Sequence, residues 1–153
     1  RFEETEQDIA THMADSVTDV DGAHGLKIEE GEWTPDMNSN PTITVQRGYY
    51  YKIGKKVTVW GKLEYSAKGT DPGELLYIKG LPFATGNPVY GGQIPNFRGT
   101  SIIIDSASRI TGFVDYNVIY LFEILSTGAI SALNFGEIKN SGSISFTVTY
   151  LTN

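Results

Sequence analysis

The sequence contains no cysteine, and that absence excludes several kinds of chemistry at once. A chain without thiols forms no disulfide, binds no metal through thiolates and holds no cysteine nucleophile. Histidine is almost as scarce, because the only two, His12 and His24, lie in separate segments near the N-terminus. Two such residues cannot build a histidine cluster, so we expect neither a metal site nor a cofactor.

Basic residues and long apolar runs are also sparse. Lys and Arg number 12 against 18 Asp and Glu, which gives a formal net charge of −6. An acidic chain without a basic cluster does not suit the phosphate backbone of nucleic acids, so we expect no nucleic-acid partner. No apolar run approaches the roughly 20 residues that a membrane-spanning helix needs, so we expect no membrane insertion.

Glycine and aromatic residues are abundant instead. The 153 residues include Gly 17 times, Tyr 9 times, Phe 7 times and Trp 2 times. A chain of this length fits one domain with a sizeable core. Many glycines suit a fold of short strands joined by tight turns.

The clearest strand signal runs from residue 57 to residue 65. Here Val57, Val59, Gly61, Leu63 and Tyr65 alternate with Thr58, Trp60, Lys62 and Glu64. Successive side chains of a strand point to opposite faces, so this pattern predicts one buried and one polar face. The preceding segment 43–53 is rich in β-branched and aromatic residues, and the short spacer 54–56 favours a tight hairpin.

Further strands are expected at 75–78, 101–105, 110–115, 117–125, 129–135 and 143–150. In the last of these, Ile144, Phe146, Val148 and Tyr150 alternate with small polar residues and are predicted core. About eight or nine strands, separated by turn signals, are typical of an all-β fold. We therefore predict an antiparallel β-sandwich of the jelly-roll type over residues 31–153.

Residues 1–16 carry the only helical pattern. Phe2, Ile9 and Met13 form a narrow apolar stripe, and the first turn is acidic, as a helix N-terminus prefers. A lone helix of this length is marginal in water, whereas the narrow stripe suits a coiled-coil seam. We expect a self-associating stalk helix, followed by a linker over 17–30. The alternatives are a frayed terminus and a helix that lies on the domain.

Catalytic signatures are missing from the sequence. It contains no HExxH, GxSxG, P-loop or GxGxxG motif. Asp105, Asp115 and Glu123 lie on or beside predicted strands, and two such carboxylates can flank a glycosidic bond. Solvated strand faces and turn caps are the better explanation, because an acidic chain contains such pairs by chance. We expect a protein that is not an enzyme.

Two groups of residues suit ligand binding. Trp60 points away from the predicted core, and Tyr49–Tyr51 must place at least one ring on the polar side of their strand. Flat rings suit sugar faces and wet interfaces. For Trp60 the open interpretations are a subunit interface, a sugar contact, and cross-strand packing in a second small core.

The second group lies in the glycine-rich segment 84–100, which we expect to be a long excursion with at most one short strand. Its candidate ligand contacts are Tyr90, Gln93, Asn96 and Arg98. Arg98 suits an acidic sugar or a phosphate. In the alternative interpretation, Phe97 anchors the segment to the core and Arg98 bridges to a neighbouring carboxylate.

Three short motifs occur in order along the chain. They are GEWTP at 31–35, GYYYKIG at 48–54 followed by VTV at 57–59, and IKGLPF at 78–83. Together they resemble the C-terminal domains of bacteriophage tail fibres and related receptor-binding proteins. The preceding helix and linker also look like the stalk-to-head junction of such fibres.

The resemblance implies a homotrimeric virion protein, part of a tail fibre or another surface appendage. Its β-sandwich head would bind a host cell-surface polysaccharide or cell-wall glycan during host adsorption, with no fixed set of binding residues. Phe2 and Ile9 would then face the threefold axis. The alternative is a structural trimerising tip or virion decoration domain without its own ligand. A third interpretation is a polysaccharide-degrading tailspike, although such heads are usually much longer.

Overall fold

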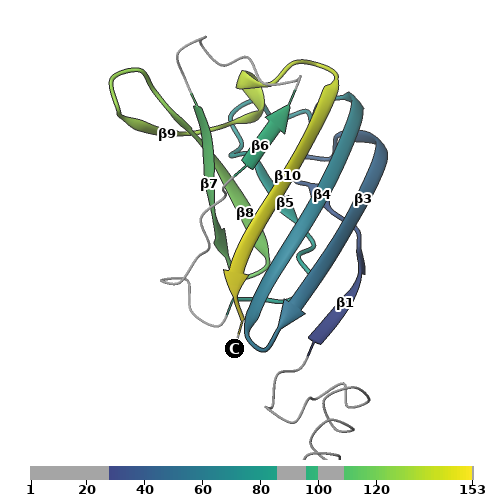
Figure 1. The fold of residues 1–153 in the computed structure, drawn as a ribbon. Coiled ribbons are helices and arrows are strands. Elements are labelled where there is room, and N and C mark those ends of the chain that lie inside the picture. The colour runs from purple at the N-terminus through teal and green to yellow at the C-terminus, as the bar shows by residue number, and fades with distance from the viewer. Residues whose placement is uncertain (1–27, 86–95, 100–108, 153) are drawn as a thin grey trace, which may run out of the picture.

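The computed structural model describes residues 28–85, 96–99 and 109–152, and these form two antiparallel sheets (Figure 1). Sheet A contains β1 (Ile28–Trp33), β3 (Thr42–Ile53), β4 (Lys56–Ala67), β10 (Gly142–Leu151) and β6 (Asn96–Gly99), in that spatial order. Sheet B contains β2 (Asp36–Met37), β5 (Tyr77–Lys79), β8 (Val118–Ile124) and β7 (Arg109–Asp115) in that order, with β9 (Ile130–Ala132) paired to β8. The prediction of an all-β, antiparallel fold is confirmed for this part of the chain.

Alternation along the strands places the core between the two sheets. From sheet A, Val57, Val59, Leu63, Ile144 and Val148 are fully buried. They join one hydrophobic cluster with residues of sheet B, namely Ile78, Val114, Ile119 and Leu121. The faces predicted to be buried in 57–65 and 143–150 are therefore confirmed.

The hairpin between β3 and β4 turns through two residues, because Ile53 pairs with Lys56. Gly54 adopts a φ of 54°, a conformation that glycine reaches without the steric cost that a Cβ imposes. Both strands are longer than the sequence indicated, and each spans 12 residues. This long hairpin is the centre of sheet A.

The three motifs meet in space. The indole of Trp33, from the first motif, occupies the space that a side chain at Gly48 in the second motif would fill. Phe83, from the third motif, packs edge-on against Tyr50, with ring centroids 5.2 Å apart and an interplanar angle of 84°. The three segments therefore build one corner of the molecule, where β1 and β3 lie against the chain that follows β5.

The prediction of a strand over 129–135 was wrong in its second half. Strand β9 ends at Ala132, and Phe135–Glu137 form a 3-10 turn instead. Asn134 begins this turn with a capping box: its side chain accepts a hydrogen bond from the Gly136 amide at 2.9 Å, and Glu137 accepts one from the Asn134 amide at 2.8 Å. These local hydrogen bonds replace a continued strand, so that only an isolated bridge between Asn134 and Leu75 remains, while Phe135 stays buried.

Several expectations fall on other parts of the chain. The predicted stalk helix 1–16, the linker up to residue 27 and the predicted strand 101–105 lie outside the described residues. Strand β1 begins at Ile28, so residues 28–30, which the sequence placed in the linker, pair with β3. Within the described ranges, no helix is long and apolar enough to cross a membrane.

Candidate functional site

The outer face of sheet A gathers several of the predicted binding positions. Trp60 on β4 pairs with Thr147 on β10, and Thr147 pairs in turn with Asn96 on β6. Neighbouring strands lie about 4.8 Å apart, so the backbones at 60 and 96 are about 10 Å apart. Arg98, two residues further along β6, pairs with Ser145 on β10. Asn96 and Arg98 therefore lie on a short strand at the edge of the sheet.

The remaining predicted site residues lie outside the described residues. These are the ligand contacts Tyr90 and Gln93 and the stalk residues Phe2 and Ile9. Their predicted roles stay predictions.

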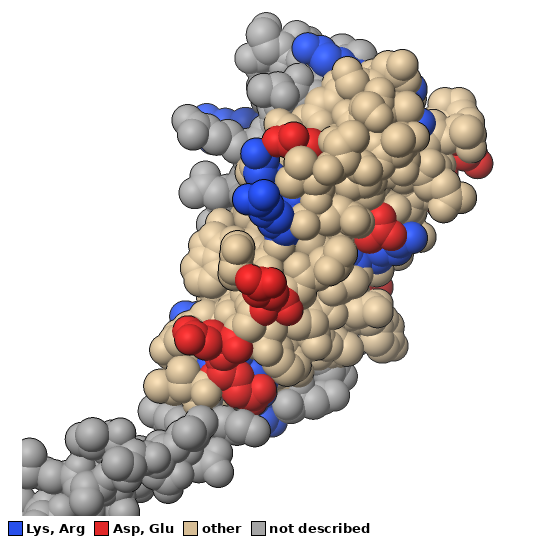
Figure 2. Space-filling view, turned by 90° about the vertical axis from the view of Figure 1, so that its right-hand side faces the viewer, with Lys and Arg blue, Asp and Glu red and all other residues tan. Residues whose placement is uncertain are grey.

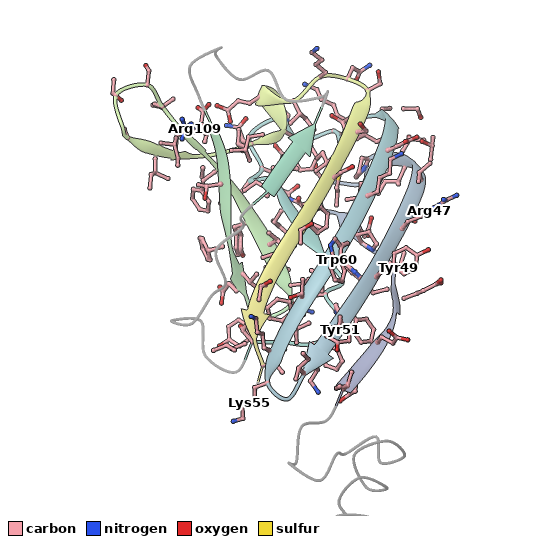
Figure 3. The ribbon with its side chains drawn as sticks, in the orientation of Figure 1. Arg47, Tyr49, Tyr51, Lys55, Trp60 and Arg109 are labelled. Atoms are coloured by element: carbon pink, nitrogen blue, oxygen red, sulfur yellow. The ribbon has the colours of Figure 1, made fainter. Side chains whose placement is uncertain are left out.

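Strand register arranges the outer face in three rows. The central row is Glu32, Tyr49, Trp60 and Thr147. One flanking row is Glu30, Tyr51, Thr58 and Thr149, and the other is Arg47, Lys62 and Ser145. Figure 3 shows Arg47, Tyr49, Tyr51 and Trp60 along the β3–β4 hairpin. Acidic groups thus stand at the β1 end of two rows, rings in the middle and hydroxyls on β10.

The two most exposed rings of this face are Tyr49, at 54% exposure, and Trp60, at 44%. The outward orientation predicted for Trp60 is confirmed. Directly opposite residues of an antiparallel pair have Cβ atoms about 4.5–5.5 Å apart, so these two rings are immediate neighbours. A flat surface of this kind suits the apolar face of a sugar ring.

Trp33 fixes the backbone beneath both rings. From the inner side of the sheet, its indole N–H donates to the carbonyl of Trp60 at 3.1 Å and to that of Tyr49 at 3.3 Å. The indole lies edge-on to Phe146, with ring centroids 6.1 Å apart. Because Trp33 is itself buried, the outer rings stand on a rigid support.

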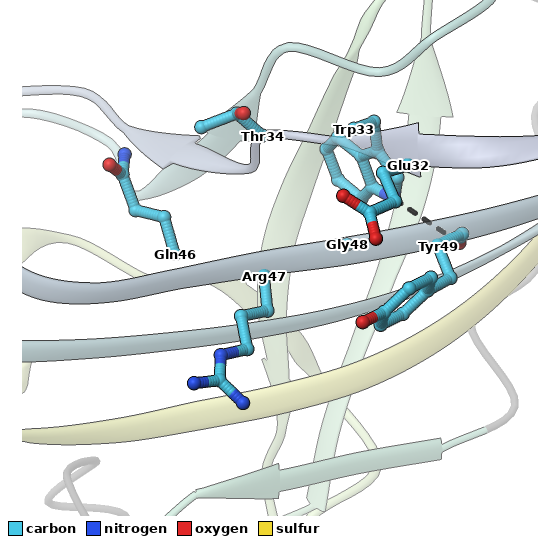
Figure 4. Close-up of a pocket in the computed structure, with 7 residues that line it drawn as sticks. All are labelled: Glu32, Trp33, Thr34, Gln46, Arg47, Gly48 and Tyr49. Atoms are coloured by element: carbon cyan, nitrogen blue, oxygen red, sulfur yellow. Dashed lines mark hydrogen bonds between the residues drawn. The ribbon is translucent and has the colours of Figure 1, made fainter.

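Two adjoining depressions border the rings. The larger, here called the aromatic depression, has a volume of about 520 Å³ and is lined by Glu30, Gly31, Glu32, Tyr49, Tyr50, Tyr51 and Trp60. The smaller has a volume of about 280 Å³ and is lined by Glu32, Trp33, Thr34, Gln46, Arg47, Gly48 and Tyr49 (Figure 4). Glu32 and Tyr49 are shared, so the two depressions form one continuous surface beside β1.

Charge is distributed unevenly over this surface. Glu29 and Glu64 pair with lysines, at 2.7 Å to Lys52 and 2.6 Å to Lys62. Among the described residues, neither Glu30 nor Glu32 has an ion-pair partner. Figure 2, which faces the β1 side of the molecule, shows acidic side chains at intervals toward one end of this edge. No described lysine or arginine forms an ion pair with the carboxylates of the aromatic depression, and Arg47 lines only the smaller depression, which shares Glu32.

Hydroxyl groups continue the polar lining toward β10. The hydroxyls of Thr58 and Thr149 lie 2.9 Å apart in a hydrogen bond across β4 and β10. Thr147 and Ser145 are half-buried on the same face. Hydroxyl groups beside exposed rings can donate hydrogen bonds to sugar hydroxyls and accept hydrogen bonds from them.

The carboxylates considered for catalysis do not come together. Asp115 pairs with Val118, which precedes Glu123 by five positions along β8. At about 3.4 Å per residue, this separation is about 17 Å, beyond the roughly 5–9.5 Å of a glycosidase carboxyl pair. Asp105 lies outside the described residues. In the described ranges, no group of three or more acidic or histidine residues could hold a metal ion.

A second aromatic surface, which was not predicted from the sequence, lies on the outer face of sheet B. This ring cluster consists of Tyr77, Phe113, Tyr120 and Phe122, with neighbouring ring centroids 5.3–5.4 Å apart. The register Tyr77–Tyr120–Phe113 crosses three strands. Strand β8 is apolar on both faces, so alternation could not reveal which of its rings would be outside.

Compared with known proteins, the chain matches no family model and no curated protein. The resemblance to phage tail-fibre heads therefore rests on the three motifs. The structure shows where two of these motifs lie. GEWTP and GYYYKIG supply Trp33, Gly48 and Tyr49, which help to build the outer face of sheet A around the exposed rings.

Proposed function

We propose that this chain is the receptor-binding head of a bacteriophage tail fibre or a related virion appendage, and that it binds a bacterial surface glycan during host adsorption. It acts by binding, without catalysis, and as a homotrimer. The observation that carries the proposal is the exposed pair Tyr49 and Trp60 on a rigid sheet, with carboxylates on one side and hydroxyls on the other. Flat rings with polar neighbours are the usual means of binding a sugar ring.

The proposal includes a jelly-roll-like sandwich that follows a stalk helix over 1–16 and a linker that ends at residue 27, before β1. Supporting it, the chain passes repeatedly between the sheets: β1 lies in sheet A, β2 in B, β3 and β4 in A, β5 in B, and β10 returns to A. Both sheets contribute to one buried cluster. Crossing connections of this kind are typical of Greek-key and jelly-roll folds.

The ligand surface in this proposal is the outer face of sheet A. It includes Trp60 and, at the β6 edge, Asn96 and Arg98. Tyr90 and Gln93, which precede β6 in the chain, remain proposed contacts.

The test is binding of the full chain to an array of bacterial surface polysaccharides, followed by adsorption to cells that carry the glycan found. Trp60→Ala and Tyr49→Ala are expected to abolish binding while the melting temperature holds. Tyr116→Ala is the matched control, since it removes an exposed ring, 60% accessible, that belongs to neither aromatic surface. If Trp60→Ala and Tyr49→Ala both bind as tightly as the wild-type chain, the outer face of sheet A is not the ligand surface.

The second candidate function is a structural trimerising tip or decoration domain without its own ligand. The observation that favours it is the ring cluster of sheet B, since exposed rings in contact with one another are typical of subunit interfaces. A head that forms trimers and binds no polysaccharide on the array would support this function.

A further inference from the structure

We infer that the aromatic depression binds a positively charged amine of the glycan, as in a saccharide with amino sugars that are not N-acetylated. This inference rests on the proposed function and deepens it by naming the chemistry of the ligand. Three rings of the outer face, Tyr49, Tyr51 and Trp60, line the depression together with two carboxylates. Of the residues that the structure describes, no lysine or arginine lines it.

The first argument is the mutual placement of rings and carboxylates. Glu32 pairs with Tyr49, and Glu30 pairs with Tyr51, so each carboxylate stands directly beside a ring on the neighbouring strand. Aromatic faces attract cations through the negative charge at the centre of the ring. A carboxylate beside such a face adds a full negative charge at short range. Both kinds of group therefore favour a cation and disfavour an acidic sugar.

The second argument is the difference between neighbouring glutamates. Glu29, on the inner side of β1, is paired to Lys52 at 2.7 Å, and Lys52 also lies 4.8 Å from the centre of the Phe83 ring. The protein thus combines a carboxylate, an aromatic ring and an ammonium on the inner side of β1. On the outer side, Glu30 and Glu32 have the ring and the carboxylate but no ammonium from any described residue.

The third argument is the rigidity of the edge strand. On the inner side, the Tyr50 ring occupies the space that a side chain at Gly31 would take, and the hydroxyl lies 2.8 Å from the ideal Cβ position. Gly31 lies between Glu30 and Glu32 in the sequence, so this close packing fixes β1 against β3 at the position between the two glutamates. On one face of a strand, residues two apart are separated by about 6.8 Å, so an amine between Glu30 and Glu32 can contact both carboxylates.

The experiment compares two probes on the full chain by calorimetry at mildly acidic pH: a β-1,4-linked glucosamine tetramer and its fully N-acetylated counterpart. They share a backbone and differ in the charge of the amine. We expect the amine form to bind at least about tenfold more tightly. The double variant Glu30→Gln/Glu32→Gln is expected to lose this preference, and Trp60→Ala is expected to lose binding of both probes.

The matched control is the double variant Glu74→Gln/Glu123→Gln, which changes the net charge equally, lies outside the depression and breaks none of the ion pairs described above. It is expected to keep the preference, which excludes general attraction between a cation and an acidic protein. Equal affinity for both probes, no saturable binding of the amine form, or a preference that survives in Glu30→Gln/Glu32→Gln would overturn the inference. If Trp60→Ala still loses adsorption to cells in that case, the proposed function stands and only the ligand chemistry is wrong.

Discussion

Trp33 links the strands of sheet A through a single indole ring. It lies on β1, donates hydrogen bonds to carbonyls on β3 and β4, and packs edge-on against Phe146 of β10. This arrangement requires a glycine at position 48, because the indole lies where a Cβ would be. Trp33, which supports the exposed rings, can therefore occupy its position only because residue 48 on the next strand has no side chain.

Gly48→Ala is predicted to lower the free energy of unfolding by about 1–3 kcal/mol, because the added methyl group overlaps the buried indole and forces it to shift. Urea unfolding monitored by tryptophan fluorescence measures the change. Gly73→Ala is the control, since its Cβ would meet only Asp71 Oδ1, at an ordinary 3.6 Å. Equal stability of the two variants would contradict the proposed packing.

Tyr150 gives the protein a predicted sensitivity to alkali. Burial raises the pKa of its hydroxyl well above the usual value of 10.0, and the Phe83 backbone opposes this only in part. Above pH 10 the unfolded chain therefore releases a proton that the folded chain retains. The stabilising contribution is complete below pH 10 and falls by about 1.4 kcal/mol for each pH unit above it. Urea unfolding at pH 9 to 11 should show this decline, and Tyr150→Phe should reduce its slope.

At the scale of single elements, alternation predicted the strands that have one apolar face. β4 and β10 have buried residues at every second position, such as Val57, Val59 and Ile144. The pairing of these strands was not predictable, because it joins distant segments: Thr58 and Thr149 are 91 residues apart. The position of β6 beside β10 depends on the same kind of long-range contact.

The candidate site was predictable only in part, for a physical reason that β1 illustrates. Its inner face contains Glu29, Gly31 and Trp33, so the strand has no run of apolar residues at every second position. The space at Gly31 is filled by Tyr50 from another strand, which no local pattern reveals. The sequence therefore indicated Trp60 as an outward ring but not that Glu30 and Glu32 line the same depression.

The 3-10 turn after β9 depends on its capping residue. Asn134→Ala removes the hydrogen bond from the Gly136 amide, so we predict a loss of about 0.5–2 kcal/mol in the free energy of unfolding. Urea unfolding again measures it. Asn140→Ala provides the comparison, because it truncates an exposed asparagine whose side chain makes none of the hydrogen bonds described here. A stability loss of the same size in Asn140→Ala would show that the cap has no special role.

At the scale of the whole molecule, two aromatic surfaces face away from the core on opposite sheets. The outer face of sheet A combines its rings with charged residues such as Arg47, Glu30 and Glu32. The ring cluster of sheet B packs its rings against one another. Subunit interfaces favour aromatic residues and exclude charge at their centre, whereas saccharide sites combine rings with polar groups. We therefore propose that sheet B serves association and that sheet A serves ligand binding.

This assignment predicts a homotrimer in solution whose stability depends on both the stalk and the ring cluster. Sedimentation velocity of the full chain at micromolar concentration should show a trimer. Phe113→Asp is expected to shift the population toward monomer, because a carboxylate would be desolvated at the centre of the interface. Ile9→Asp should act in the same direction if Ile9 faces the threefold axis, whereas Trp60→Ala should leave the trimer intact. A monomeric wild-type chain would refute the trimer. If Phe113→Asp leaves the trimer intact, the subunit interface is formed by the stalk alone or by the rings of sheet A.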